Sequence, residues 1–224
     1  MDDFIKHAQV RLPRQIPADI SVHLFPVAHL EGLTESHLDL VSAAERTRAD
    51  SPSAPPHRLL SYILLRLVLG ARTGMNPRDV SLNLDKPGTA ACISGTVRPL
   101  YASLSRTSDF IAVSLAERQV AVDIEELQNF EQAIQLLSLL HPADQKRLGS
   151  WLARRRKRNF ATEITAAWTR KEAALKLLGT GLNRDPSLDE VGSRNSPLAP
   201  EGCQVAQLSV PHSRYPELAV AWRE

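Results

Sequence analysis

The sequence has little cysteine and no long hydrophobic run. Only two cysteines, Cys92 and Cys203, occur among the 224 residues, and they form neither a CxxC pair nor a metal-ligand spacing. We therefore do not expect a disulfide-stabilised secreted scaffold. The longest apolar run, Leu59–Leu69, is interrupted by Ser61 and Arg66 and is too short to span a bilayer.

The chain also lacks an excess of either charge. Lysine and arginine number 27 and aspartate and glutamate 25, which gives a net charge of +2. This balance argues against a dedicated nucleic-acid-binding protein. The first six residues contain two acids and lack the apolar core of a signal peptide. We expect a cytoplasmic protein with no nucleic-acid or membrane partner.

Apolar residues make up 43% of the chain and charged residues 23%, which is typical of a globular fold. The length allows one large domain or two small ones. Apolar periodicity and turn residues predict strands at 20–24, 82–84, 100–104, 110–115, 120–124, 204–210 and 218–222. The same signals predict helices at 45–49, 57–70, 132–140, 143–151 and 160–178, with a capping box at Ser42 and Glu45 and a stop at Gly70. Without regular strand–helix–strand alternation, this order indicates an α+β fold.

The most informative predicted strand is Val120–Glu125, which reads VAVDIE. Side chains alternate between the faces of a strand, so three branched apolar residues point into the core and Asp123 and Glu125 share the other face. Carboxylates two residues apart on one face lie about 6–7 Å apart. That arrangement suits a hard divalent cation such as Mg²⁺, although a solvated strand end would carry the same acids.

The predicted helix at 160–178 carries Trp168, Lys171, Glu172 and Lys176 in the segment WTRKEAALK. Glu172 and Lys176 are four residues apart and share one helix face. A third carboxylate with an ammonium group suits a site that handles phosphate. An ordinary ion pair on the helix surface would have the same spacing.

Together, the two segments resemble the Sfp-type 4′-phosphopantetheinyl transferase family. Its members carry a G/A-V-D-I-E strand followed by a W-x-x-K-E-A-x-x-K helix, which stand here as Ala121–Glu125 and Trp168–Lys176. The Gly-x-Gly-Leu after that helix matches Gly179–Leu182. Weaker similarities upstream lie at Ser42–Arg48, His57–Leu60, Asp85–Pro87 and Leu104–Thr107.

The resemblance implies an α+β fold of two similar halves related by a pseudo-twofold axis, with the active site between them. We place the boundary near Ala116, so that residues 1–116 form the half that contacts coenzyme A and residues 117–224 the half with the metal site. It also implies an enzyme of the holo-acyl-carrier-protein synthase type. Such an enzyme moves the 4′-phosphopantetheine group of coenzyme A onto a serine of an apo acyl or peptidyl carrier protein, releases 3′,5′-ADP and requires Mg²⁺. The size of the family's members suggests a monomer.

The family motifs assign roles to individual residues. Asp123, Glu125 and Glu172 would bind Mg²⁺, and Glu172 would also accept the proton of the incoming serine. Lys176 would bind a phosphate and stabilise the leaving group. The remaining residues that would contact coenzyme A phosphates are Arg48, Lys86, Ser105 and Arg106. The family carries histidine where this sequence has Arg106, which keeps a permanent charge and binds phosphate with a forked group but cannot serve in a role that requires the release of a proton near neutral pH.

Three alternatives remain open at this point. A non-catalytic relative would bind coenzyme A or a carrier protein without transfer. An unrelated Mg²⁺-dependent phosphate enzyme would carry the motifs by chance. A basic interaction protein would instead use the run Arg154–Arg158, and its acidic residues would be dispensable.

Overall fold

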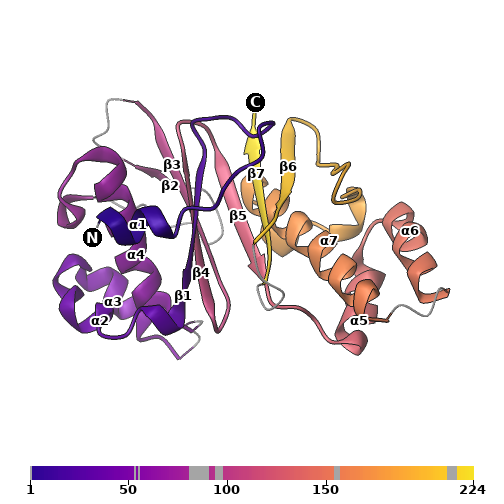
Figure 1. Ribbon diagram of the computed structural model, residues 1–224, viewed down its shortest axis with the longest axis horizontal. Helices are drawn as coiled ribbons and strands as arrows, with labels where there is room; N and C mark the ends of the chain where they lie inside the picture. Colours follow the sequence, from indigo (N-terminus) through magenta and orange to yellow (C-terminus); the bar gives the residue numbers. More distant parts are fainter. Residues whose placement is uncertain are drawn as a thin grey trace.

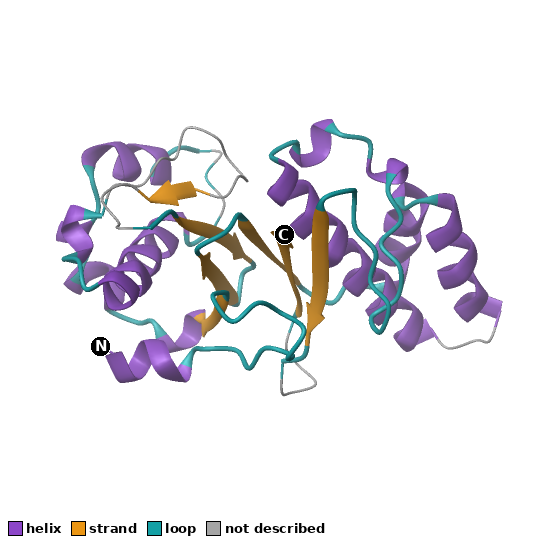
Figure 2. Cartoon of the chain, turned by 90° about the horizontal axis from the view of Figure 1, so that it is seen from above, coloured by secondary structure: helices purple, strands orange, loops and turns teal. Residues whose placement is uncertain are grey.

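Two antiparallel sheets lie face to face between two groups of helices in the computed structural model (Figure 1). The structure describes residues 2–52, 54, 56–80, 91–93, 98–153, 157–210 and 216–224. The first sheet has the order β1-β4-β3-β2, with β1 (Ser21–Pro26), β2 (Ala91–Ile93), β3 (Leu100–Arg106) and β4 (Phe110–Ala116). The second has the order β5-β7-β6, with β5 (Val120–Glu125), β6 (Cys203–Leu208) and β7 (Glu217–Arg223). Seen from above, the strands again occupy the middle and the helices both ends (Figure 2).

The helices divide between the two outer layers. Beside the first sheet lie α1 (Asp2–His7), α2 (Leu33–Ser36), α3 (Ala43–Ala49) and α4 (Arg58–Thr73), and beside the second lie α5 (Phe130–Leu139), α6 (Pro142–Ala153) and α7 (Lys157–Leu178). Short 3₁₀ turns occur at Val27–His29, Leu38–Leu40, Pro77–Asp79, Gly181–Asn183 and Pro186–Leu188. The α+β prediction is confirmed.

The two halves repeat one order of connections. Each runs from a strand through a long helix to an antiparallel pair of strands, and the last strand of that pair lies in the middle of its sheet. In the first half these elements are β1, α4, β3 and β4, and in the second half they are β5, α7, β6 and β7. The two halves therefore share the order of their connections. A pseudo-twofold axis and a domain boundary near Ala116 stay predictions.

Apolar side chains fill the space between the sheets. Alternation along the strands sends one set of side chains toward the other sheet and the next set toward the helices. The set between the sheets consists of Val22, Leu24, Ala112, Ala116, Val120, Val122, Ile124, Ala206, Leu208, Leu218, Val220 and Trp222. Ile16 and Ile20, which precede β1, belong to the same cluster. The segment before the first strand therefore packs into the core between the sheets.

The free edge of β5 is covered by serine side chains of β3. The amide of Val122 donates to Ser103 Oγ over 3.2 Å, and the amide of Ile124 donates to Ser105 Oγ over 3.3 Å. Unpaired backbone amides of an edge strand would otherwise be buried without partners. The two hydroxyls therefore replace a neighbouring strand and join the sheets.

Buried charges of α7 hold the segment that follows it. Arg170 is fully buried and donates to the carbonyl oxygens of Val191 and Gly192 at 3.3 and 2.9 Å. Lys171 is also buried, and its ammonium donates to the carbonyl oxygen of Asp189. These side chains satisfy backbone groups of a long segment that has few regular elements of its own.

Several predicted elements need correction. The helix predicted to stop at Gly70 continues to Thr73, and Gly74 ends it with a φ of 73°. The predicted loop at 184–200 contains a 3₁₀ turn and a bridge between Gly192 and Pro197. The strand predicted at 82–84 and the turn at 86–88 lie outside the described residues.

The glycine at position 70 has a steric reason that is unrelated to helix termination. A Cβ atom at this position would lie 2.7 Å from Cγ of Pro77 and 3.1 Å from the carbonyl oxygen of Met75. Only glycine allows α4 to approach the following turn so closely.

We expect Gly70→Ala to lower the free energy of unfolding by about 1–3 kcal/mol, because the added methyl group overpacks this contact. Gly149→Ala in α6 is the matched control, since nothing lies within 4 Å of a Cβ atom there. It should stabilise the protein by about 0.5–1 kcal/mol through helix propensity. Urea denaturation of both variants measures the difference, and equal effects would contradict the packing explanation.

Candidate functional site

Three carboxylates from two elements meet on the helix-facing side of β5. Asp123 and Glu125 come from the strand, and Glu172 comes from α7, which packs against it. One oxygen atom from each lies within 4.8 Å of the others. The alternation predicted for β5 is confirmed, because Val122 and Ile124 point to the core between the sheets.

Asp123 is the most buried of the three, with 1% of its surface exposed. Its Oδ1 accepts hydrogen bonds from Ser105 Oγ at 2.9 Å and from Lys176 Nζ at 2.5 Å. Its Oδ2 is buried and has no hydrogen-bond partner among the described residues. A buried carboxylate oxygen without a partner is costly, and a cation held with the other two acids would satisfy it.

The hydroxyl of Ser105 is fully used inside this cluster. It donates its single hydrogen to Asp123 and accepts from Lys176 Nζ at 3.0 Å and from the amide of Ile124 at 3.3 Å. A hydroxyl offers one donor and two acceptor positions, so none is left. Ser105 therefore positions Asp123 and Lys176 in this state, while its predicted contact with coenzyme A stays a prediction.

Lys176 pairs with the strand rather than with its helix neighbour. Its ammonium contacts Asp123 and Ser105, and among the described residues no ion pair joins it to Glu172. The simple surface pair considered for the spacing of Glu172 and Lys176 is therefore wrong. An ammonium has three hydrogens, so two bonds leave one for a further acceptor.

Burial and mutual repulsion raise the pKa values of the acids. Desolvation, followed by the charges of Asp123 and Glu172, raises the pKa of Glu125 to about 8. Desolvation and then Asp123 raise the pKa of Glu172 to about 7. Desolvation also raises the pKa of Asp123, against the opposing effect of Lys176. A divalent cation would remove this repulsion.

A fourth carboxylate lies nearby but is engaged elsewhere. Glu217 is the cross-strand partner of Glu125 in the pairing of β5 with β7. Its two oxygens accept from Arg194 at 3.0 and 2.7 Å, and Gln207 donates to it at 2.8 Å. The cluster available to a cation therefore has three acids rather than four.

Arg106 follows Ser105 directly but lies on the opposite face of β3. There it approaches α4, where burial and then the charge of Arg58 lower the pKa of its guanidinium, while Tyr62 raises it. The Nε atoms of Arg106 and Arg58 are both buried without hydrogen-bond partners among the described residues. Two neighbouring guanidinium groups with unused donors form a candidate site for an anion.

The sequence analysis named Arg106 and Arg48 but did not name Arg58, which lies near both. The Nη1 atom of Arg58 donates to the carbonyl oxygen of Arg48 at 3.1 Å, so Arg58 links the two predicted residues. A signal was present, because Arg58 and Arg66 are the only charged residues of α4 before Arg72 and stand in a mostly apolar stretch. Lys86 and residues 154–156 of the basic run lie outside the described residues, so their predicted contacts stay predictions.

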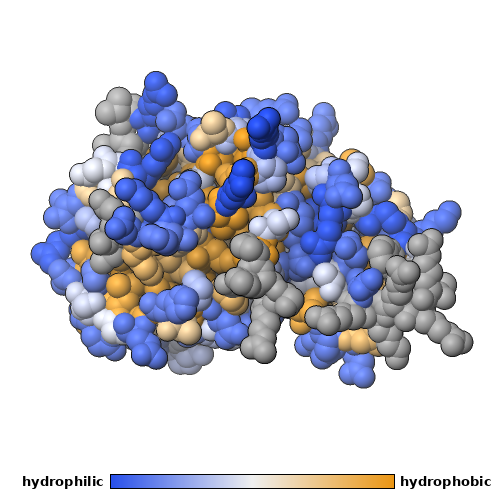
Figure 3. Space-filling model, viewed as in Figure 1, coloured by the Kyte–Doolittle hydropathy of each residue, from blue (hydrophilic) through white to orange (hydrophobic). Residues whose placement is uncertain are grey.

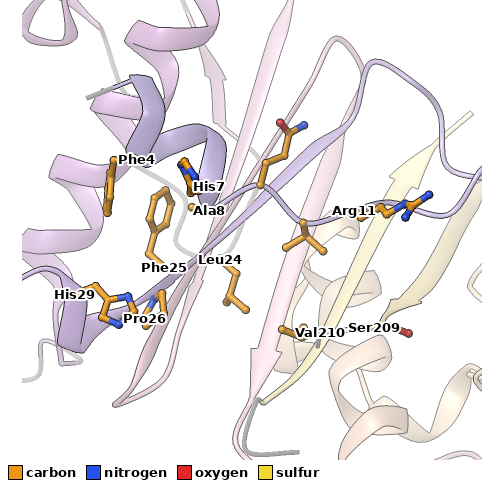
Figure 4. Close-up of a pocket in the computed structure, with 12 residues that line it drawn as sticks. Phe4, His7, Ala8, Arg11, Leu24, Phe25, Pro26, His29, Ser209 and Val210 are labelled. Carbon is orange, nitrogen blue, oxygen red and sulfur yellow. The ribbon is translucent and has the colours of Figure 1, made fainter. Parts of the chain in front are cut away.

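A separate hollow lies on another part of the surface. An apolar strip runs through the middle of the face in Figure 3. A cavity of about 530 Å³ lies between α1, β1 and the segment after β6 (Figure 4), and its walls include Phe4, His7, Leu24, His29 and Val210. Asp123, Glu125 and Glu172 do not line this cavity, so it is separate from the acidic cluster.

In the metal-free protein we expect stability to fall as the pH rises from about 5 to about 8. The folded state keeps protons on Glu125 and Glu172 up to pKa values of about 8 and about 7, whereas the unfolded chain releases them near 4.5. The folded state then binds more protons, so rising pH favours unfolding. The melting temperature should therefore fall across this range in chelator, and millimolar Mg²⁺ should raise it most at pH 8.

Glu125→Gln is the control for this pH dependence. It removes one titrating group and should flatten the curve measured in chelator. Parallel curves for the wild type and the variant would contradict the electrostatic explanation.

We expect Ser105→Ala to cost about 1–3 kcal/mol of stability, because it leaves the amide of Ile124 and Oδ1 of Asp123 with fewer partners. Ser114→Ala is the matched control: Ser114 is fully buried on β4, and its hydroxyl has no hydrogen-bond partner among the described residues. Its removal should be neutral or stabilising. Chemical denaturation compares the two variants, and equal losses would show that the hydroxyl of Ser105 has no special role.

Comparison with known protein families identifies the part of the chain that carries the acids. Residues 119–207 match the family model of the 4′-phosphopantetheinyl transferase superfamily (ACPS). This segment contains β5 and α7, and therefore all three acids and Lys176. A comparison with curated proteins finds no match. Residues 119–207 thus form a domain of the 4′-phosphopantetheinyl transferase superfamily.

Proposed function

We propose that this protein is an Sfp-type 4′-phosphopantetheinyl transferase that modifies a serine of an apo acyl or peptidyl carrier protein and releases 3′,5′-ADP. The observation that carries the proposal is the buried Asp123, which clusters with Glu125 and Glu172 in the segment that matches the superfamily and has one oxygen without a partner among the described residues. The proposal includes a holo-acyl-carrier-protein synthase reaction by a monomeric cytoplasmic enzyme. No helix among the described residues is long and apolar enough to cross a membrane.

The three acids fit a magnesium ion. Mg²⁺ takes oxygen ligands and is commonly bound by a few carboxylates together with substrate phosphates. Asp123, Glu125 and Glu172 would hold it, and Oδ2 of Asp123 has no other partner in the described part of the chain. When bound, the ion would offset negative charge on the pyrophosphate of coenzyme A.

The reaction requires a nucleophile, a base and a stabilised leaving group. The serine oxygen of the carrier forms a bond to the β-phosphorus of coenzyme A, and the bond from that phosphorus to the bridging oxygen breaks. Glu172 would accept the serine proton, because a serine hydroxyl is a weak nucleophile unless a base is near. The bridging electrons leave with 3′,5′-ADP, and the remaining donor of Lys176 would stabilise the charge of this leaving group.

The basic residues around the start of α4 support binding of the remaining phosphates. Arg106 and Arg58 both have a buried donor without a partner among the described residues, and Arg58 contacts the backbone of Arg48. Arg106 replaces the histidine of the family, so the charge at this position does not depend on pH near neutrality. Lys86 would complete the set.

Incubation of an apo acyl carrier protein and an apo peptidyl carrier protein with coenzyme A, Mg²⁺ and this protein tests the proposal. We expect one carrier to gain the mass of a single phosphopantetheine group in intact-mass spectrometry. Glu172→Gln and Asp123→Ala should abolish the gain, because each removes a carboxylate of the cluster. Chelator should abolish it as well.

Glu126→Gln is the matched control for these variants. Glu126 follows Glu125 directly but is exposed and accepts a hydrogen bond from Ser108 outside the cluster. This variant should retain transfer. If no carrier gains mass while coenzyme A still binds, the non-catalytic alternative is favoured, and absence of both binding and transfer would overturn the proposal.

A further inference from the structure

A buried ion pair lies in the first half of the molecule, apart from the acidic cluster. It joins Arg66 in the middle of α4 to Glu45 in α3, and the two residues are 5% and 2% exposed. Neither was assigned a role in catalysis or binding by the sequence motifs.

Arg66 connects three segments of the chain. Its Nη2 atom donates to both carboxylate oxygens of Glu45, at 3.1 and 3.0 Å. Its Nη1 atom donates to the carbonyl oxygens of Pro77, Arg78 and Val80, at 3.0, 3.3 and 2.7 Å. The four Nη hydrogens of the planar guanidinium are shared among these five acceptors, which the three hydrogens of a lysine ammonium could not reach in the same way, and Nε is buried without a partner among the described residues.

Glu45 also fixes the start of α3. Its carboxylate accepts the amide of Ser42 at 2.7 Å, and Ser42 Oγ accepts the amide of Glu45, which completes the capping box. Near the other end of α3, Arg58 of α4 donates to the carbonyl oxygen of Arg48. Two arginines of α4, about 12 Å apart along its axis, therefore hold both ends of α3.

The ion pair fixes the position of α3 more than it adds to the stability of the fold. A helix of seven residues is not stable alone, so tertiary contacts determine the position of α3. A buried ion pair is often no more stabilising than apolar residues of similar volume. Its distinctive property here is directional bonding, which fixes where α3 and α4 lie relative to each other.

We infer that Glu45 and Arg66 form a positioning pair that places Arg48 and Arg58 for binding the phosphates of coenzyme A. The inference rests on the proposed function. Neither side chain of the pair needs to touch the substrate. Because the acidic cluster belongs to β5 and α7, a displaced α3 should weaken substrate binding while the chemical step continues.

Glu45→Gln and Arg66→Lys test this inference. Glutamine keeps an oxygen for the cap but removes the charge, and lysine keeps the charge but loses the forked contacts. We expect each variant to raise KM for coenzyme A about tenfold, with kcat within about twofold of the wild type. Titration calorimetry with 3′,5′-ADP should show the same loss of affinity with an unchanged number of binding sites.

The exposed pair of Arg78 and Asp39 provides the matched control. It contacts the same segment as Arg66, but both side chains are more than half exposed, at 60% and 57%. Asp39→Asn should change neither KM nor affinity.

A purely structural role gives a different result. Loss of folded protein would lower kcat and the number of binding sites while KM and the affinity of the remaining sites stay constant, and this outcome would overturn the inference. Calorimetry keeps the test valid for a partly folded variant, because it measures the number of sites and their affinity separately. If the wild type binds neither coenzyme A nor 3′,5′-ADP, the proposed function fails together with this inference. Equal affinity of wild type and variants overturns the inference alone.

Discussion

Asp123 carries its carboxylate into the contact between the two halves, where Ser105 of the first sheet and Lys176 of the outer helix both donate to it. Burying a carboxylate costs several kcal/mol unless such partners are in place. Ser105 therefore adds a polar link between the halves, and the three side chains together form the buried base of the acidic cluster. Because one oxygen of Asp123 stays without a partner among the described residues, assembly of the fold leaves a defined position for a cation.

Neighbouring residues of α7 have two different roles, one structural and one in the acidic cluster. Arg170 and Lys171 are buried and bind the backbone of the segment after α7, whereas Glu172 and Lys176 turn toward β5. The helical period of 3.6 residues separates these directions within a single turn. The anchored segment also brings Arg194 to the carboxylate opposite Glu125, which keeps that acid out of the cluster.

Much of this could be predicted from the sequence because it depends on local periodicity. Alternation in β5 placed Asp123 and Glu125 on one face, and the motif in α7 supplied the third acid. The extent of α4 could not be predicted, since Gly70 marks a close approach to a turn rather than a helix end. The partner of Lys176 could not be predicted either, because spacing along a helix does not reveal which strand packs against it. The neighbours of Arg106 likewise depend on how α4 crosses the sheet.

The opposite directions of Ser105 and Arg106 constrain how this strand can change during evolution. A single-residue insertion or deletion in β3 before these positions would exchange the two side chains between the faces of the sheet. An arginine would then meet the edge of β5, and a hydroxyl would face the arginines of α4. Length variation among descendants of this sequence should therefore accumulate in the connections around β3, while the strand itself keeps its length.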